Sequence, residues 1–418
     1  LNDGIYNFMG NEHDLRGFVM DYDPFALKVF TEYCYRRNRF RLDAHSAAAA
    51  DFDAGELIVS DMSGDNFSQK PLSVFWKIHP QAGFQIQKMT GELSGMTFDL
   101  ARDPNKALTA EALNLIGKMG INCRKALSML DEELAEKVAS LELGEGYALT
   151  GQWSILKGSS KSLADSLFFN GDLTGRDFEF YGYRFYDLSA HFLYSPEAAY
   201  IRNLVVSDTC GNVQIEQMDF FHQGNGYWQA LSPAVMVNEF KPSLIKSVKP
   251  APPQAGKSLV IRSLSINDVN GILGDKNSFT GFGQLTFANP PKKNLQPTIL
   301  AIPAELLTRI GLDLAVLTPV RGTILFNIKD GKADLNRFKD VYSKGRLSKF
   351  YLANNGQNSY VDFDGNLNLQ VRMKQYNIIF KLAELFTVTV QGTLRKPTYA
   401  LQKQQKQDET SNTALRAG

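Results

Sequence analysis

Residues 361–374 read VDFDGNLNLQVRMK, and this stretch decides the fold. Apolar residues alternate with polar ones, and the apolar set is Phe363, Leu367, Leu369, Val371 and Met373, with Gly365 in the same phase. A period of two places the two sets on opposite faces of a β-strand. The spacing therefore predicts one long strand, about 40 Å at ~3.3 Å per residue, in a sheet with one dry face and one wet face.

The dry face has two interpretations. It is either an ordinary packed core or an open trough that holds something apolar. The stretch at 386–402, FTVTVQGTLRKPTYALQ, repeats the alternation before a Gly-Thr-Leu-Arg-Lys-Pro corner. The side chains predicted to line an apolar groove are Phe363, Leu367, Leu369, Val371, Met373, Phe386, Val388 and Val390.

Short alternating stretches separated by glycine turns recur through most of the chain, for example GELIVSD at 55–61 and GNVQIEQMDFF at 211–221. This recurrence predicts a mainly β protein made of elongated, curved antiparallel β-sheet modules with an open apolar groove and a small helical insert. The predicted organisation is an N-terminal segment (1–46), a β module (47–108), a helical insert (109–141), a β module (142–240), a Pro/Lys-rich linker (241–258), a C-terminal β module (259–401) and a disordered tail (402–418).

Helices are expected at three places. Asp23-Pro24 is typical of a helix start and predicts a helix over 23–36. Leucines and a valine at steps of three and four predict helix in the 109–141 insert. Pro303 and Gly311 are expected to begin and end a short helix.

The charge and cysteine content exclude some classes of protein. The net charge is +1, from 45 basic and 44 acidic residues, so nucleic acid is not an expected partner. Three cysteines, far apart, do not form a disulfide framework. No apolar run of ~18 residues could span a bilayer. Because the chain begins at Leu1 rather than Met, we expect any membrane anchor to lie upstream of it.

No motif indicates catalysis. The five histidines have no metal-ligand spacing, and no Cys-x-x-Cys pair or Gly-x-Ser-x-Gly elbow occurs. The sequence GFGQLTF at 281–287 enters a strand rather than a helix, which argues against a phosphate loop. Ten Phe and Tyr residues in 168–194 are either core or a ligand-lining wall. We therefore expect a protein that is not an enzyme and has no cofactor or metal.

The segment 259–401 resembles the C-terminal region of the AsmA-like family, which includes TamB-related envelope proteins. The likeness rests on SLSINDVNGILG, a Gly-x-Gly-x-Leu strand, RGTILFNIKDGKADL, the alternating strand and VQGTLRKPTYAL. Residues 171–221 look like an earlier module of the same kind. The detailed sequence is also similar to that of large AsmA-type proteins of chlamydia-like bacteria. The resemblance implies a long curved sheet with an apolar groove, a periplasmic location, an inner-membrane anchor and a role in moving lipids toward the outer membrane.

Three functions are consistent with these observations. The first is an envelope protein that bridges or transfers phospholipid between inner and outer membrane, or assists outer-membrane assembly, with acyl chains and possible envelope proteins as partners. The second is a structural or interaction β-module of a large surface or envelope protein without lipid transport. The third is a carbohydrate-binding protein or enzyme, for which the usual acidic partners of the aromatic residues are missing.

Overall fold

The computed structural model describes residues 4–8, 11–23, 26–35, 38–48, 51–61, 70–123, 143–157, 165–180, 182–224, 227–241, 244, 246–247, 260–288, 319–343, 346, 348–375, 385–393 and 396–403. Nearly all of these residues lie in antiparallel β-strands. The prediction of a mainly β protein is confirmed. The chain divides into two compact units. The boundary between them falls within two strands, β15 (Tyr227–Phe240) and β17 (Val260–Ile272).

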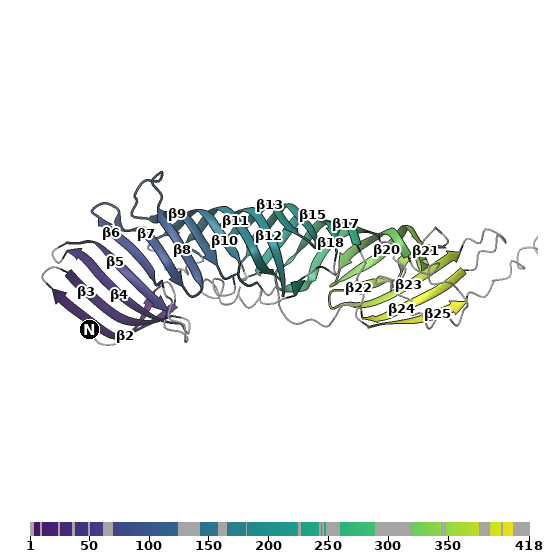
Figure 1. Ribbon diagram of the computed structural model, residues 1–418, viewed down its shortest axis with the longest axis horizontal. Coiled ribbons are helices and arrows are strands. Elements are labelled where there is room, and N and C mark those ends of the chain that lie inside the picture. The colour runs from purple at the N-terminus through teal and green to yellow at the C-terminus, as the bar shows by residue number, and fades with distance from the viewer. Residues whose placement is uncertain are drawn as a thin grey trace, which may run out of the picture. The chain divides into compact units, whose positions relative to one another are not determined.

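The first unit is a sheet whose strands pair in chain order (Figure 1). Each strand from β1 to β14 is antiparallel to the next. Its strands are β1 (Gly4–Phe8), β2 (Asn11–Asp23), β3 (Ala26–Tyr35), β4 (Asn38–Ala48), β5 (Asp51–Asp61), β6 (Leu72–His79), β7 (Gly83–Leu93), β8 (Met96–Arg102), β9 (Ala112–Ile121), β10 (Tyr147–Leu156), β11 (Leu167–Phe180), β12 (Tyr183–Tyr194), β13 (Ala198–Asp208) and β14 (Gly211–Gln223), with the short β16 (Lys246–Ser247) beside β12.

The second unit continues the same kind of antiparallel pairing. Strand β15 pairs with β17, and β18 pairs with β19. Strand β20 pairs with both β21 and β22, and each of these two short strands also pairs with β23. Strand β23 pairs with β24, and β24 pairs with β25. The remaining elements are β18 (Asp275–Ala288), β19 (Pro319–Lys329), β20 (Lys332–Ser343), β21 (Ser348–Leu352), the 3-10 turn η4 (Ala353–Gly356), β22 (Tyr360–Asp362), β23 (Asn366–Gln375), β24 (Leu385–Thr393) and β25 (Lys396–Lys403).

Two-residue turns connect several neighbouring strands. Ser94 and Gly95 have φ values of 50° and 74°, and Asp330 and Gly331 have φ values of 53° and 72°. Turns with positive φ at both central residues match the right-handed twist of the strands that they join. The turn chemistry therefore favours antiparallel neighbours and a sheet that grows strand by strand.

Left-handed residues also occur within strands. Asn203 in β13 and Asp340 in β20 have φ values of 52° and 51°, and each lies at a point where its strand has one residue more than the neighbouring strand, β12 and β19 respectively. Asp177 in β11 and Asp268 in β17 also have left-handed φ values, of 49° and 52°. An extra left-handed residue of this kind bends a strand and increases its twist. We infer that these bulges curve the sheet within each unit over its apolar face.

Two of the helix predictions are wrong within the described residues. Residues Ala26–Tyr35 form β3, not part of a helix over 23–36, and Ala112–Ile121 form β9, not the start of a helical insert. In β9 the apolar residues also alternate, and Gly117 and Gly120 are poor helix formers. Pairing with strands on both sides satisfies the backbone of each segment, so tertiary structure outweighs the helical spacing. Residues 124–141 and 303–311 lie outside the described residues.

The long strand predicted over 361–374 is divided by a turn. Asp362 ends β22, and its Oδ1 accepts hydrogen bonds from the backbone N–H groups of Asp364 (3.0 Å) and Asn366 (2.7 Å). Gly365 has a φ of 83° and completes the turn before β23. The side-chain amide of Asn366 also bonds to this carboxylate and is the largest cause of its lowered pKa. Aspartate and glycine in the sequence DFDG thus favour a turn over continued strand.

Two predicted boundaries also shift. Lys246–Ser247 of the predicted linker form β16, which pairs with Tyr183 and Arg184. The predicted tail begins at Gln402, but β25 extends to Lys403. Residues from 404 onward lie outside the described residues.

Candidate functional site

Six of the eight residues predicted to line a groove lie together on one face of the second unit. Four come from β23 and two from the neighbouring β24, and the register pairs Leu369 with Val390 and Val371 with Val388. Their side chains are 2–7% exposed: Leu367, Leu369, Val371, Met373, Val388 and Val390.

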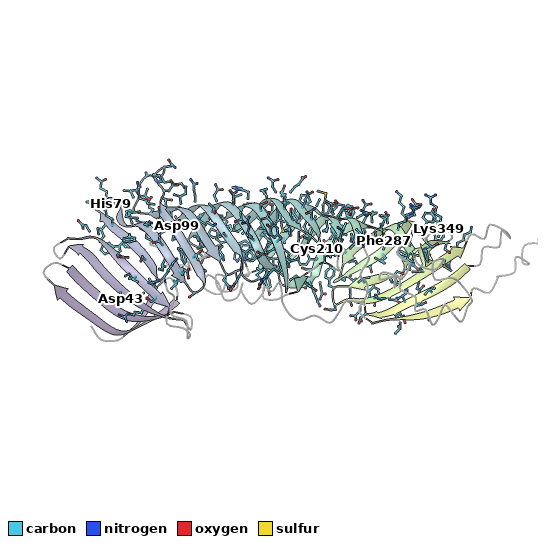
Figure 2. The ribbon with its side chains drawn as sticks, in the orientation of Figure 1. Asp43, His79, Asp99, Cys210, Phe287 and Lys349 are labelled. Carbon is cyan, nitrogen blue, oxygen red and sulfur yellow. The ribbon has the colours of Figure 1, made fainter. Side chains whose placement is uncertain are left out.

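Side chains from other strands of the second unit complete this cluster. Phe287 of β18, Val341 of β20 and Phe350 of β21 are the most deeply buried of them, at 1–2% exposure. Phe287 is labelled in Figure 2. A cluster that is closed to this degree resembles the packed interior of a domain. At these positions the structure favours the packed-core interpretation of the dry face over an open trough.

The other two predicted residues behave differently. Phe363 lies in the turn between β22 and β23 and is 43% exposed, so it does not share the face of the cluster. The backbone of Phe386 pairs with Met373 in β23, but its side chain lies outside the described residues.

The first unit has an apolar face of its own. Five buried residues on four consecutive strands form its centre: Leu100, Leu115, Leu149, Trp153 and Phe169. Partly buried apolar side chains surround them, among them Met89, Phe98, Met119, Leu173 and Phe192. The rings of Trp153 and Phe169 lie 4.4 Å apart between centroids, and those of Phe169 and Phe192 lie 5.9 Å apart. This face, which we call the inner face of the first unit, retains partly exposed apolar surface.

Glycines in register allow the aromatic rings to lie flat on the sheet. Gly117, Gly151 and Gly171 are direct neighbours on β9, β10 and β11. A Cβ atom at Gly171 would lie 2.9 Å from Cζ of Phe169, and one at Gly151 would lie 2.6 Å from the Cα of Gly171. Side chains at these positions would therefore displace the rings or the backbone.

The opposite face of the same strands is polar. Across β8, β9, β10, β11 and β12, the register aligns Asp99, Lys118, Thr150, Asp172 and His191. His191 Nδ1 lies 3.2 Å from Asp172 Oδ1, on an exposed surface. Opposite charges on neighbouring strands add modest stability to a sheet. The first unit therefore combines one apolar face and one hydrated face.

The two described free cysteines are not activated nucleophiles. Burial raises the pKa of the Cys123 thiol to about 12. Burial, followed by a hydrogen bond with Asp208, raises the pKa of the Cys210 thiol to about 11. Reactive thiols have lowered pKa values instead. Within the part of the chain that the structure describes, no group of three or more His, Cys, Asp or Glu residues could hold a metal ion.

Three side chains place polar groups on or beside the inner face, and the sequence analysis did not predict them. Trp153 is 6% exposed, and its indole Nε1 has no hydrogen-bond partner. Gln87 Nε2 is also buried without a partner. Arg102 has the same phase as Phe98 and Leu100 in β8. A charged residue in the phase of an apolar alternation is a signal that can be seen in the sequence.

The chain was compared with protein-family models, curated proteins and solved structures. No family model, curated protein or solved structure matches this chain. In the described ranges, no helix has the length and apolar character needed to cross a membrane.

Proposed function

We propose that this chain is a non-enzymatic protein of the cell envelope whose apolar sheet face binds the acyl chains of phospholipids. In this proposal it bridges or transfers lipid between inner and outer membranes, or assists outer-membrane assembly. The observation that carries the proposal is the inner face of the first unit, which crosses consecutive strands from β8 to β12 and lies opposite a polar face.

Apolar area on the inner face would supply the free energy of lipid binding. Burying apolar surface gains about 25 cal/mol per Å². Partly buried residues such as Phe98, Met119 and Phe192 have surface left to cover on the inner face. An acyl chain lying across the strands would cover it without requiring a polar partner. The cluster in the second unit has less to gain, because its side chains are already buried.

The location and the anchor belong to the same proposal. The resemblance of 259–401 to AsmA-like proteins supports a periplasmic site and an inner-membrane anchor upstream of Leu1. Lipid and envelope proteins are the partners that this reading requires.

A second function is supported by a different observation. The closed cluster around Leu369, Val371 and Phe350 is the interior expected of a structural or interaction module. Under that reading the chain is a scaffold within a larger envelope or surface protein and carries no lipid.

Lipid extraction separates the two functions. The protein is expressed in a Gram-negative host, purified without detergent and extracted for mass spectrometry of bound lipid, with a same-size soluble β-protein purified in parallel. The lipid-binding function predicts stoichiometric phospholipid that the control lacks. A lipid content equal to that of the control would refute it and favour the structural module.

A further inference from the structure

Hydrogen-bond donors that lack acceptors lie on or beside the inner face of the first unit. Trp153 Nε1 and Gln87 Nε2 are both buried and unpartnered. Arg102 is half-buried, and no ion pair or side-chain hydrogen bond of its guanidinium occurs with the described residues. We call Gln87, Arg102 and Trp153 the donor cluster.

The strand register brings these three residues into one neighbourhood. Arg102 in β8 pairs with Leu115 in β9, and Leu115 pairs with Trp153 in β10. Adjacent strands lie about 4.8 Å apart, so the backbones of Arg102 and Trp153 are about 10 Å apart. Gln87 immediately precedes Lys88, which pairs with Ala101, so it lies beside Arg102 on the neighbouring strand β7.

Other buried polar side chains close to this place do have partners. Gln85, two residues before Gln87, is 2% exposed and donates to the carbonyls of Ala82 (3.0 Å) and Thr109 (2.8 Å). Asp103 follows Arg102, but its carboxylate accepts from the backbone N–H of Asn105 and from a side-chain amide on β10. These two buried polar groups therefore have partners, whereas Gln87 Nε2 and Trp153 Nε1 do not.

The chemistry of the donor cluster defines what would complete it. All three groups donate hydrogen bonds, and the guanidinium of Arg102 carries a permanent positive charge. A buried donor left without an acceptor is destabilising, and hydrogen bonds to charged acceptors are the stronger ones. The complementary group is an oxyanion, and the apolar residues around the cluster require that it be attached to an apolar chain.

We propose that the donor cluster binds the oxyanion end of an amphipathic lipid, a carboxylate or a phosphodiester, whose acyl chain lies on the inner face. This rests on the proposed lipid-binding function and adds a fixed position for the polar end of the lipid. The apolar face holds any acyl chain, and the donor cluster selects lipids by their head.

A matched pair of ligands tests the head group separately from the chain. Oleate and oleyl alcohol have the same chain, and only oleate carries a charged oxyanion. The chain contains three tryptophans, so Trp76→Phe with Trp228→Phe leaves Trp153 as the sole tryptophan, which is excited selectively at about 295 nm. We expect oleate to shift the Trp153 emission and to bind about tenfold more tightly than oleyl alcohol. Inorganic phosphate alone should do neither.

Two substitutions then locate the selectivity. Trp153→Phe keeps an aromatic ring and removes the N–H donor, and Arg102→Gln removes the charge. Each should reduce the preference for oleate to about twofold or less in calorimetric titrations, since each removes a bond to the charged head. Lys118→Gln, on the polar face, should leave it unchanged. Thermal melts confirm that each variant is folded.

The outcomes of these titrations distinguish recognition of the lipid head by the donor cluster from the proposed lipid-binding function itself. Equal affinity for oleate and oleyl alcohol would overturn the donor cluster and leave lipid binding intact. Binding of neither ligand would overturn the proposed function as well. Phosphate binding as tight as that of oleate would also overturn the proposal, because the site would then recognise a free anion and not a lipid.

Discussion

The substitution Leu369→Ala tests whether the apolar face of β23 is a packed core. The Leu369 side chain is 4% exposed, pairs with Val390 and belongs to the closed cluster of the second unit. Removing three carbon atoms forfeits about 2.4 kcal/mol of transfer free energy at ~0.8 kcal/mol per methylene. The cavity left in a close-packed interior adds to this, so we expect a loss of about 3 kcal/mol, within the range of ~2–5 measured for such changes.

Urea denaturation monitored by circular dichroism measures this loss. Gln370→Ala is the matched control, because Gln370 is the next residue in β23 and lies on the opposite, partly exposed face. Its stability should change by no more than about 0.5 kcal/mol. Leu369→Arg buries an unpaired charge and should unfold the second unit. A loss below about 1 kcal/mol for Leu369→Ala would refute the packed core, because an open trough wall leaves no cavity to be emptied.

Three further predictions follow from the strands and turns. Gly151→Ala should lower the free energy of unfolding of the first unit by at least ~2 kcal/mol in a urea titration, because the new Cβ would lie 2.4 Å from a backbone oxygen. Gly224→Ala is the control and should be neutral, because a Cβ there would have nothing within 4 Å. The pKa of the Asp362 carboxyl lies below its ordinary value of 3.8, so its contribution to stability should be present above that pH and be lost as the pH falls through the folded-state pKa. Asp362→Asn should flatten this part of the curve of unfolding free energy against pH, and an unchanged curve would contradict the assignment. Cys123 and Cys210 should react with iodoacetamide at pH 8 only after denaturation, as mapped by peptide mass spectrometry, since burial keeps both thiols protonated.

Period-two alternation was sufficient to predict β-structure. In β23 the apolar positions at 367, 369, 371 and 373 are all buried, as the pattern indicates. The same pattern could not show that a turn divides the stretch, because Phe363 and Gly365 fit the apolar phase. The turn depends on the hydrogen bonds that Asp362 accepts and on the positive φ of Gly365, to which the alternation gives no guide.

Helical spacing misled where apolar residues are dense. In 25–33 the residues Val29, Phe30 and Tyr33 fit a helix, yet Val29, Thr31 and Tyr33 also fit a strand. β-branched and aromatic residues favour strands, and pairing with β2 and β4 settles the conformation of this segment.

The candidate site was only partly predictable. The charge of Arg102 within an apolar alternation was readable from the sequence. The unpartnered state of Trp153 Nε1 was not, because it depends on which side chains surround the indole in the folded sheet. Whether an apolar face is open or closed also depends on the curvature of the sheet, which the alternation does not determine.

Photo-cross-linking to lipid tests the central claim most directly. We propose introducing p-benzoylphenylalanine in place of Phe192, on the inner face, or in place of Phe168, on the opposite face and 36% exposed. Both variants keep an aromatic residue of similar shape, and both are irradiated in cells labelled with radioactive phosphate. Binding of acyl chains to the inner face predicts labelled phospholipid on the Phe192 variant and little on the Phe168 variant. Equal labelling of the two, or none at either position, would contradict it.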